Sequence, residues 1–426
     1  MSFDAPLAAP RRIAVIGGGI AGMATALLLA PQNRVTLFEA APRLGGHART
    51  VIAGKRGDQP VDTGFIVFNY ANYPHLTRLF ADLDVPVQRS DMTFGVSLDG
   101  GRLEYALRNL SGLFAQRRNL ARPRFWGMLR DIARFNAGAE AAAVSDDMTV
   151  DELIAALGLG AAFRRHYLLP ICGAIWSTPS GEVGAFPARS LLRFFRNHAL
   201  LSPGGQHQWW TVSGGSVAYV TRLAARLRLL GVETRTGCPV RSVIRDAAGA
   251  QVRPEGGVAE RFDEVVLACH SDQALALLAD AIPEERADLS AIAYRPNRAV
   301  LHADPGQMPR RRACWSSWVY RAEQAGQETA VGVSYWMNRL QGIPEDDPLF
   351  VSLNPQGPLR EDLIYDEVSF DHPVFDRAAL RAQGRLAARN GSDHTWFAGA
   401  WLRFGFHEDG FASAVRIARA LDRVPA

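Results

Sequence analysis

Residues 12–50 read RIAVIGGGIAGMATALLLAPQNRVTLFEAAPRLGGHART, and this stretch decides the fold of the chain. A short apolar run at 13–16 suits a buried parallel strand. Gly17, Gly19 and Gly22 follow it with the spacing G-x-G-x-x-G. The first glycine permits a tight turn, the second lets backbone approach a pyrophosphate, and the third lets a helix pack closely on the strand.

The residues after the glycine turn complete a dinucleotide-binding unit. A helix from about Ile20 to Ala30 presents unpaired N–H groups and the positive end of its dipole to a phosphate. A second strand follows over 34–38 and ends at Glu39, 22 positions after Gly17, where a carboxylate accepts ribose hydroxyls. The strand before the motif and the helix after it distinguish it from a glycine-rich turn of another α/β fold.

The motif continues beyond Glu39 as E-x-x-x-R-x-G-G-x-x-x-T, with Arg43, Gly45 and Gly46 at its centre. This extension resembles the FAD-dependent amine oxidase and carotenoid (phytoene) desaturase superfamily, and NAD-binding domains do not usually carry it. The resemblance therefore implies FAD as the cofactor. Many relatives have arginine near the pyrophosphate where this chain has His47, which either donates to a phosphate oxygen or fills space.

Length and composition predict an ordinary globular protein of two domains. A chain of 426 residues is longer than a domain built around one small hydrophobic core. Its net charge of +4 is too small to indicate nucleic acid as a partner. The four cysteines are scattered without a CxxC motif, which indicates free thiols rather than disulfides or a metal site. No stretch approaches the ~18–20 apolar residues of a membrane span. We expect a cytoplasmic protein that can contact the inner membrane face peripherally.

Two later turns extend the expected cofactor site. The sequence predicts a turn at Asp62-Thr63-Gly64 and a helix from about Pro74. In the superfamily the equivalent turn lies against the flavin ring, which implies that Thr63, Gly64 and Phe65 lie there; the alternative is an ordinary β-turn. A glycine turn at 214–216 opens another helix, and relatives hold the adenine with the strand that would contain Val240.

The C-terminal residues 395–421 form the second informative stretch. We expect a strand over 395–398, a turn at Gly399, and a final helix from about Phe411 after the turn at 405–410. In the superfamily this helix places its N-terminus at the pyrimidine end of the flavin, where it stabilises negative charge. Both ends of the chain would then build one cofactor site. The motif and the resemblance together imply cofactor contacts from Gly17, Gly19, Ile20, Ala21, Gly22, Glu39, Ala40, Arg43, Gly45, Gly46, His47, Thr63, Gly64, Phe65, Val240, Gly399, Phe406 and His407.

The predicted fold class is α/β, with a discontinuous Rossmann-type FAD-binding domain and an inserted α+β substrate-binding domain like that of amine oxidases. We assign residues 11–90, 205–279 and 393–426 to the FAD-binding domain. Residues 91–204 and 280–392 form the substrate-binding domain. Aromatic residues of the second part are either core or cavity lining.

Five longer blocks narrow the resemblance to one branch of the superfamily. They are similar to bacterial flavoproteins linked to cyclopropane or methylated fatty acid synthesis and to the N-terminal module of plant cyclopropane fatty acid synthases. The branch includes the flavoprotein desaturases of furan fatty acid biosynthesis. It implies oxidation of a methyl-branched unsaturated fatty acyl chain, free or in a phospholipid, to a conjugated diene. An allylic hydride would pass to flavin N5, oxygen would reoxidise the flavin, and a fatty-acid methyltransferase would be a partner. The blocks are SDMTFGVSLDGG (90–101), GLFAQRRN (112–119), PICGAIWSTPS (170–180), RNHALL (196–201) and QWWTVSGGSVAYV (208–220).

Two other functions stay open. Flavin amine oxidases usually hold a water near N5 with a lysine and frame the amine with aromatic residues that include tyrosine. Here the only lysine is Lys55, in a turn between early strands, and Phe406 stands where tyrosine is common. These departures favour an apolar substrate. The third possibility is a flavin-bearing partner that presents lipid to a methyltransferase without turnover.

The proton acceptor of a desaturation is left open among Tyr365, His407, Glu408 and Asp409. Each has an ordinary alternative, because the acidic pair could cap the last helix and the tyrosine could be core. Three consecutive residues at 407–409 do not make a metal site, since they rarely converge on one ion.

A segment rich in arginine and aromatic residues could bind an anionic lipid surface. The alternative is a solvated helix face. The segment contains Arg117, Arg118, Leu120, Arg122, Arg124, Phe125 and Trp126, and Arg310, Arg311 and Arg312 form a second basic cluster.

Overall fold

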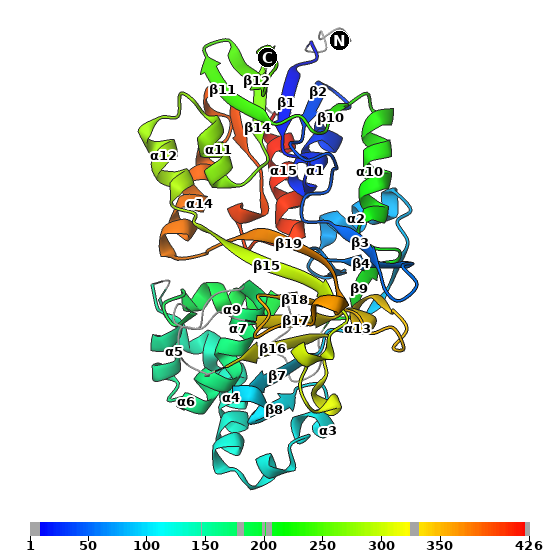
Figure 1. The fold of residues 1–426 in the computed structure, drawn as a ribbon. Coiled ribbons are helices and arrows are strands. Elements are labelled where there is room, and N and C mark those ends of the chain that lie inside the picture. The colour runs from blue at the N-terminus through cyan, green and yellow to red at the C-terminus, as the bar shows by residue number, and fades with distance from the viewer. Residues whose placement is uncertain are drawn as a thin grey trace, which may run out of the picture.

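The computed structural model describes residues 9–145, 147–176, 183–197, 201, 207–323 and 332–421. Figure 1 shows two lobes, one above the other. The upper lobe contains a five-stranded sheet, and the lower lobe contains a seven-stranded sheet with helices beside it. The predicted blocks at 170–180 and 196–201 lie partly outside the described residues.

The sheet of the upper lobe is parallel throughout. Its strand order is β10-β2-β1-β14-β20, so the first strand of the chain lies at the centre and the last lies at an edge. The bounds are β1 Arg12–Ile16, β2 Arg34–Phe38, β10 Glu233–Arg235, β14 Glu264–Leu267 and β20 Thr395–Phe397.

Successive side chains of β1 point to opposite faces of the sheet, and both faces are apolar. Ile13 and Val15 pack in one core with helices α1 (Ile20–Leu29) and α15 (His407–Leu421). Ala14 and Ile16 pack in the other, with apolar residues of three further helices. Those helices are α11 (Ser271–Leu277), α12 (Pro283–Ser290) and α14 (Arg377–Arg389).

This second core changes the assignment of two segments. Leu289 of α12 and Ala379, Ala382 and Leu386 of α14 are buried beside Phe397 of β20. The boundaries predicted at 279/280 and 392/393 placed both helices in the substrate-binding domain. Their apolar faces instead complete the core of the parallel sheet.

The seven-stranded sheet draws its strands from both predicted insertions. Every neighbouring pair is antiparallel except β16 and β7. The long strands β15 and β19 lie between the two lobes. The order is β19 (Ile364–Pro373), β15 (Tyr294–His302), β18 (Phe350–Leu353), β17 (Gly332–Trp336), β16 (Trp318–Ala322), β7 (Phe94–Leu98) and β8 (Leu103–Ala106).

Helices cover this sheet in the lower lobe (Figure 1). They are α3 (Leu110–Leu113), the 3-10 turn η2 (Arg117–Ala121), α4 (Pro123–Ala142), α5 (Val150–Ala156), α6 (Ala161–Phe163), η3 (Arg164–Leu168), α7 (Leu169–Trp176) and α9 (Ala188–Asn197). The start of α5 shows why such elements form where they do. Thr149 and Glu152 make a reciprocal capping box, each side chain accepting the backbone N–H of the other residue.

Smaller elements complete the fold. Three short sheets are β3 (Thr50–Ala53) with β4 (Gln59–Asp62), β5 (Val67–Asn69) with β9 (Trp209–Val212) and β6 (Val87–Ser90), and β11 (Val240–Asp246) with β12 (Gly249–Pro254) and β13 (Glu260–Phe262). The remaining α-helices of the described ranges are α2 (Pro74–Asp82), α10 (Val217–Leu229) and α13 (Met337–Gln341). No helix in the described ranges combines the length and apolar character needed to cross a bilayer.

Candidate functional site

The first glycine turn is held by contacts that exclude side chains. At Gly17, where φ is +114°, a Cβ would lie 2.5 Å from the carbonyl oxygen of Ala268. A Cβ at Gly22 would lie 1.8 Å from the Gly17 oxygen. At Gly19 the nearest atom to such a Cβ, the Cα of Gly46, is 4.0 Å away. The backbone at Gly19 is therefore open beside the N-terminus of α1, which fits a pyrophosphate.

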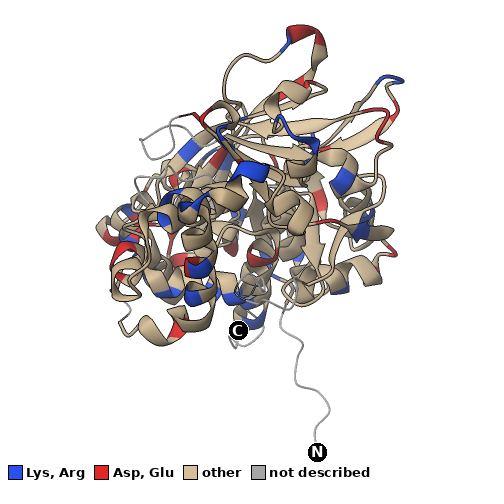
Figure 2. Ribbon diagram, turned by 90° about the horizontal axis from the view of Figure 1, so that it is seen from below, with Lys and Arg blue, Asp and Glu red and all other residues tan. Residues whose placement is uncertain are grey.

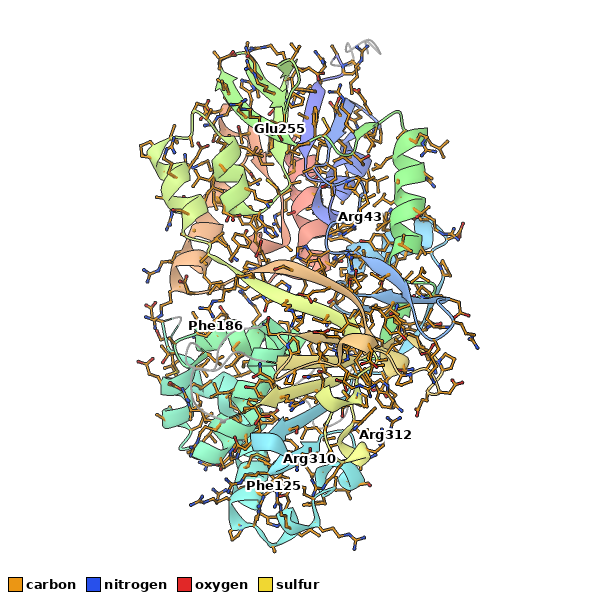
Figure 3. The ribbon with its side chains drawn as sticks, viewed as in Figure 1. Arg43, Phe125, Phe186, Glu255, Arg310 and Arg312 are labelled. Atoms are coloured by element: carbon orange, nitrogen blue, oxygen red, sulfur yellow. The ribbon has the colours of Figure 1, made fainter. Side chains whose placement is uncertain are left out.

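The second glycine turn lies directly on the first. The Gly45 N–H donates to the Gly18 carbonyl at 2.8 Å, and a Cβ at Gly46 would lie 3.1 Å from the Gly19 Cα. Arg43 folds over this turn and donates to the Gly46 carbonyl at 2.9 Å. Figure 3 shows Arg43 near the junction of the two lobes. The two turns thus form one wall of the predicted dinucleotide site, which we call the cradle.

Glu39 stands at the end of β2 with its carboxylate fixed. It accepts the N–H of Gly18 at 2.5 Å and that of Ala41 at 2.8 Å. The Cys238 N–H donates to the Glu39 carbonyl at 2.9 Å, so the loop before Val240 lies against this end of the parallel sheet. The strand that Val240 begins belongs to the antiparallel sheet β11-β12-β13.

Asp62 positions the D-T-G turn. It is 1% exposed, accepts the Thr50 hydroxyl at 2.6 Å and the Ser216 N–H at 2.8 Å, and accepts the side-chain amide of Gln341 at 2.9 Å. Burial raises the pKa of Asp62 to about 6. The carboxyl therefore joins β4, the start of α10 and α13, three segments far apart in the sequence.

The D-T-G turn itself packs on the segment directly after the second glycine turn. The Phe65 N–H donates to the His47 carbonyl at 2.9 Å, and a Cβ at Gly64 would lie 2.0 Å from that oxygen. The Phe65 ring stacks on the ring of His407 at 4.0 Å between centroids. Residues predicted from the first and last parts of the chain are thus brought together.

Helix α15 begins at His407, four positions before the predicted start near Phe411. The prediction was wrong because Asp409, read as part of the turn, accepts the N–H groups of Phe404 and Phe406 at 3.2 and 3.1 Å and so organises the first helical turn. A Cβ at Gly410 would lie 3.0 Å from Ile20. The N-termini of α15 and α1 therefore lie side by side, and both favour negative charge.

Gly399 lies between β20 and α15. Its N–H donates to the Ser413 hydroxyl of α15 at 3.0 Å. A Cβ there would lie 2.2 Å from the indole nitrogen of Trp401, which donates to the Cys269 carbonyl at 2.9 Å. The predicted turn therefore joins the last strand, the last helix and the loop after β14.

Two histidines from distant segments lie beside His47. Its ring stacks on Phe370 at 4.8 Å and lies 5.8 Å from His270 and 6.1 Å from His372. Burial lowers the pKa of His47 to about 3, so the imidazole is neutral near pH 7. Within the described ranges no three His, Cys, Asp or Glu side chains are arranged to hold a metal ion. Nothing in the local sequence marked His270 or His372.

Of the four candidate proton acceptors, His407 is the one whose ring lies near His47. Its Nε2 lies 2.5 Å from the hydroxyl of Tyr219 on α10. Burial, and then the nearby His47, lower the pKa of His407 to about 3. The imidazole is thus neutral and hydrogen-bonded.

Two predicted catalytic residues lie elsewhere. Glu408 accepts the N–H groups of His75 and Leu76, each at 3.0 Å, and so caps α2. Tyr365 is 40% exposed on β19, on the face opposite to Phe370. The alternation of β19 decides where Tyr365 points, and the N-terminus of α2 decides where Glu408 points.

Replacing Glu408 by glutamine tests its capping role. Burial raises the Glu408 pKa from 4.5 to about 7, so the folded state keeps a proton that the unfolded state releases between those values. The contribution of Glu408 to the free energy of unfolding therefore falls as the pH rises from 4.5 to about 7. We expect Glu408→Gln and wild type to match near pH 5, and the variant to be more stable near pH 8 by up to ~3 kcal/mol.

Urea unfolding of both proteins at the two pH values measures this difference. A variant that loses turnover while showing the wild-type stability profile would instead identify Glu408 as the proton acceptor.

Aromatic side chains of α9 meet the C-terminal turn. The ring of Phe194 stacks on Phe406 at 5.1 Å and lies 6.5 Å from Phe404. The Arg193 guanidinium lies 4.9 Å over the Phe404 ring. The sequence missed Phe194, although the amphipathic pattern of its helix could have indicated a buried face. The only lysine is distant from this group, because Lys55 contacts Asp346 and Asp347.

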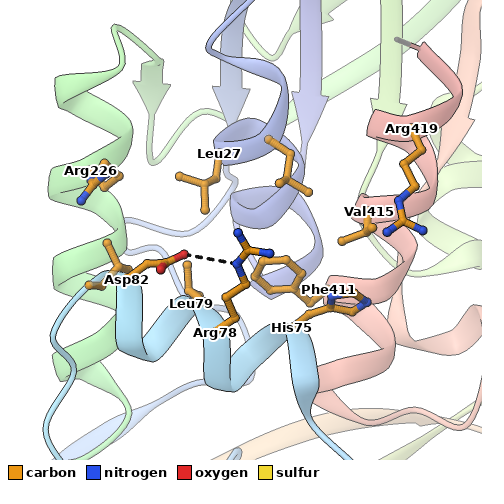
Figure 4. Close-up of a pocket in the computed structure, with 11 residues that line it drawn as sticks. Leu27, His75, Arg78, Leu79, Asp82, Arg226, Phe411, Val415 and Arg419 are labelled. Carbon is orange, nitrogen blue, oxygen red and sulfur yellow. Dashed lines mark ion pairs between the residues drawn. The ribbon is translucent and has the colours of Figure 1, made fainter. Parts of the chain in front are cut away.

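A pocket of about 410 Å³ lies on the outer side of the upper lobe. Figure 4 shows Leu27, Leu79, Phe411 and Val415 within it and arginines at its edge. Its lining comes from α1, α2, α10 and α15, and none of the predicted site residues contributes to it.

Comparison with known proteins identifies the family. The model of the flavin containing amine oxidoreductases matches residues 20–303, about two thirds of the chain. The chain belongs to this family. It is an FAD-dependent oxidoreductase, and the open cradle at Gly19 fits that cofactor. FAD supplies a two-electron acceptor when bound.

Several known proteins are similar to this family member. A carotenoid phi-ring synthase of Chlorobaculum tepidum is 42% identical over 81 residues, which are 18% of this chain and only 12% of that protein. A CLA-producing fatty acid isomerase from P. acnes is 15% identical, with 99% and 100% of the two chains covered and a TM-score of 0.67.

Two amine oxidases are equally similar in structure. A putrescine oxidase variant is 16% identical over 97% of this chain and 99% of that one, with a TM-score of 0.70. Cyclohexylamine oxidase from Brevibacterium oxydans is 17% identical over 97% and 100%, with a TM-score of 0.67. At these identities the likeness shows the fold and leaves the substrate open.

Proposed function

We propose that this oxidoreductase desaturates a methyl-branched unsaturated fatty acyl chain to a conjugated diene. The observation that carries the proposal is the stacked pair of Phe194 and Phe406. The pair is an apolar aromatic contact beside the start of α15, where the family's flavin would lie, with Phe194 buried and Phe406 half-buried. Apolar walls suit an acyl chain, because burying its methylene groups is favourable by ~0.8 kcal/mol each.

The charges around Phe194 and Phe406 disfavour an amine as the substrate. Arg193 places a positive charge over the ring of Phe404, next to Phe406. The nearest acidic residues of the turn, Glu408 and Asp409, already accept backbone N–H groups. At this turn, as far as the structure describes it, a cationic substrate would therefore meet a like charge and no carboxylate that lacks a partner, which is costly in a partly dry site.

The residues of the chain supply orientation and a dry environment for the reaction. The acyl chain loses a hydride from an allylic carbon and a proton from the neighbouring carbon, so one new double bond forms in conjugation with the first. The backbone N–H of His407, at the start of α15, would stabilise negative charge on the cofactor when it is bound. One protein with this fold is named as a fatty acid isomerase, so an acyl substrate is compatible with the fold.

Anaerobic mixing tests the proposal. We expect a phospholipid with a methyl-branched monounsaturated chain to bleach the visible absorbance of the bound flavin, and putrescine and cyclohexylamine to leave it unchanged. The matched lipid without a double bond lacks allylic hydrogens and should not bleach the flavin. Bleaching by the amines alone would overturn the proposal. No bleaching by either, with tight binding to a fatty-acid methyltransferase, would favour a lipid-presenting partner.

A paired substitution locates the substrate. Phe194→Glu places a carboxylate against the Phe406 ring, and we expect lipid-dependent bleaching to slow at least about tenfold while FAD stays bound. Phe194→Leu keeps an apolar side chain and should retain most of the rate. Equal bleaching rates in both variants would show that the acyl chain does not contact Phe194.

A further inference from the structure

The end of the lower lobe concentrates positive charge. Residues 105–130 contain six arginines and no Asp, Glu or Lys, so they carry +6 while the whole chain carries +4. The other 400 residues therefore sum to −2. Figure 3 shows Phe125 and Arg310 at this end, and Figure 2 views the molecule from below, toward it.

The same segment exposes large apolar side chains. Leu107, Leu110, Leu120 and Trp126 are 38%, 74%, 51% and 48% exposed. They are four of the thirteen large apolar side chains that are exposed among the described residues, although they come from only 20 consecutive positions. We call these four residues, with Arg108, Arg117, Arg118, Arg122 and Arg124, the basic tip.

The basic tip is ordered by its own contacts. The Trp126 indole N–H donates to the Leu120 carbonyl at 2.9 Å, and its ring lies 5.4 Å from that of Phe114. Asn109 caps α3 by accepting the N–H of Gly112 at 2.8 Å. Leu110, the first residue of α3, and Trp126, near the start of α4, are thus held in place while their apolar surfaces stay in water.

The arginines of the tip also crowd one another. The pKa of Arg118 is lowered by its desolvation and then by the neighbouring charges of Arg122, Arg311 and Arg102. The nearest acidic residue, Glu104, is fully buried and is paired with Arg311 at 2.8 Å. Positive charge at the tip is therefore not neutralised by exposed carboxylates within the segment.

We propose that the basic tip docks this enzyme on the surface of an anionic phospholipid bilayer. Arginines around exposed leucine and tryptophan side chains match a lipid interface, where cations meet headgroups and indole rings sit at headgroup level. A folded nucleic acid would use the charge but not the leucines. Docking does not depend on the reaction proposed above, because it is measured without turnover.

The tip is also connected to the aromatic surface of the upper lobe. Helix α4 begins at the tip, and its Phe135 packs edge-on against Phe195 of α9 at 6.3 Å. The adjacent Phe194 stacks on Phe406. A docked enzyme would therefore hold one continuous helix between the bilayer and the proposed acyl surface.

Sedimentation with vesicles tests the docking. The FAD-loaded enzyme should bind vesicles of phosphatidylcholine with phosphatidylglycerol, bind pure phosphatidylcholine far less, and dissociate in high salt. Arg117→Gln, Arg118→Gln and Arg124→Gln combined should weaken binding about 100-fold, at about fivefold for each charge. Leu110→Gln should weaken it further, because its side chain leaves the interface. The matched control removes three exposed arginines of the upper lobe, Arg228, Arg253 and Arg286, and should bind like wild type.

Other outcomes would overturn the docking. One is equal binding by the tip variant and the control variant. Another is equal affinity for neutral and anionic vesicles. A third is a single-stranded RNA that binds the tip as tightly as the vesicles and displaces them, which would make it a general polyanion site. Far-UV circular dichroism and flavin content of the variants show that a loss of binding is not a loss of fold.

Discussion

The substitution Gly22→Val should yield a protein without bound FAD. In wild type a Cβ at Gly22 would lie 1.8 Å from the Gly17 carbonyl oxygen and 3.3 Å from the Ala268 Cβ. Both Gly17 and Ala268 are backbone-constrained, so α1 must move away from β1 and the cradle opens. We expect the Gly22→Val protein to show no flavin absorbance after purification and a large loss of thermal stability.

Two other glycine variants make this result specific. Gly19→Ala adds a Cβ where the nearest atom is 4.0 Å away, so the apoprotein should keep its Tm while the methyl group obstructs the pyrophosphate and raises the Kd for FAD at least about tenfold. Gly384→Ala lies in α14 with no atom within 4 Å and should keep FAD and gain ~0.5–1 kcal/mol. FAD titration of the three apoproteins distinguishes these cases. Normal flavin content in Gly22→Val would contradict the packing at β1.

Arg245→Met should cost about 3–5 kcal/mol of unfolding free energy. Arg245 is 4% exposed and donates to both oxygens of Glu285, at 2.6 and 2.8 Å, with Asp280 as a second partner. Removing the guanidinium leaves the carboxylate of Glu285, 2% exposed, without its countercharge. The loss should separate β11 from α12, which this network joins.

A second bidentate pair provides the matched control. Arg298 binds Glu367 at 2.6 and 2.7 Å with nearly the same geometry, but the two side chains are 50% and 47% exposed. Water and salt screen this pair, so Arg298→Met should cost no more than about 1 kcal/mol. Urea unfolding of both variants measures the contrast. Equal losses would mean that burial does not decide the strength of these pairs.

The parts of the fold that local patterns encode were predictable. The strand at 12–16, the helix after Gly22 and the strand at 34–38 form where the apolar run and the glycine spacing place them. The family match supports the cofactor inferred from the extension at Arg43. These features depend on residues within about 40 positions of one another.

The parts that failed depend on distant contacts. The start of α15 is set by Asp409 turning back to Phe404 and Phe406. The lobe to which α14 belongs is set by β20, and the environment of His47 is set by His270 and His372. No local pattern reports such partners, and a single sequence contains no direct record of them.

The position of β20 has a consequence for how the enzyme is made. This strand and α15 are the last elements among the described residues, yet they complete the edge of the parallel sheet and one of its covering layers. During synthesis the N-terminal glycine turns emerge long before their partners. The nascent chain therefore exposes an unpaired strand edge at β14 until β20 has been synthesised, and the two helix N-termini of the site meet only after α15 follows. A stop codon in the last helix would produce an apoprotein prone to aggregation and degradation.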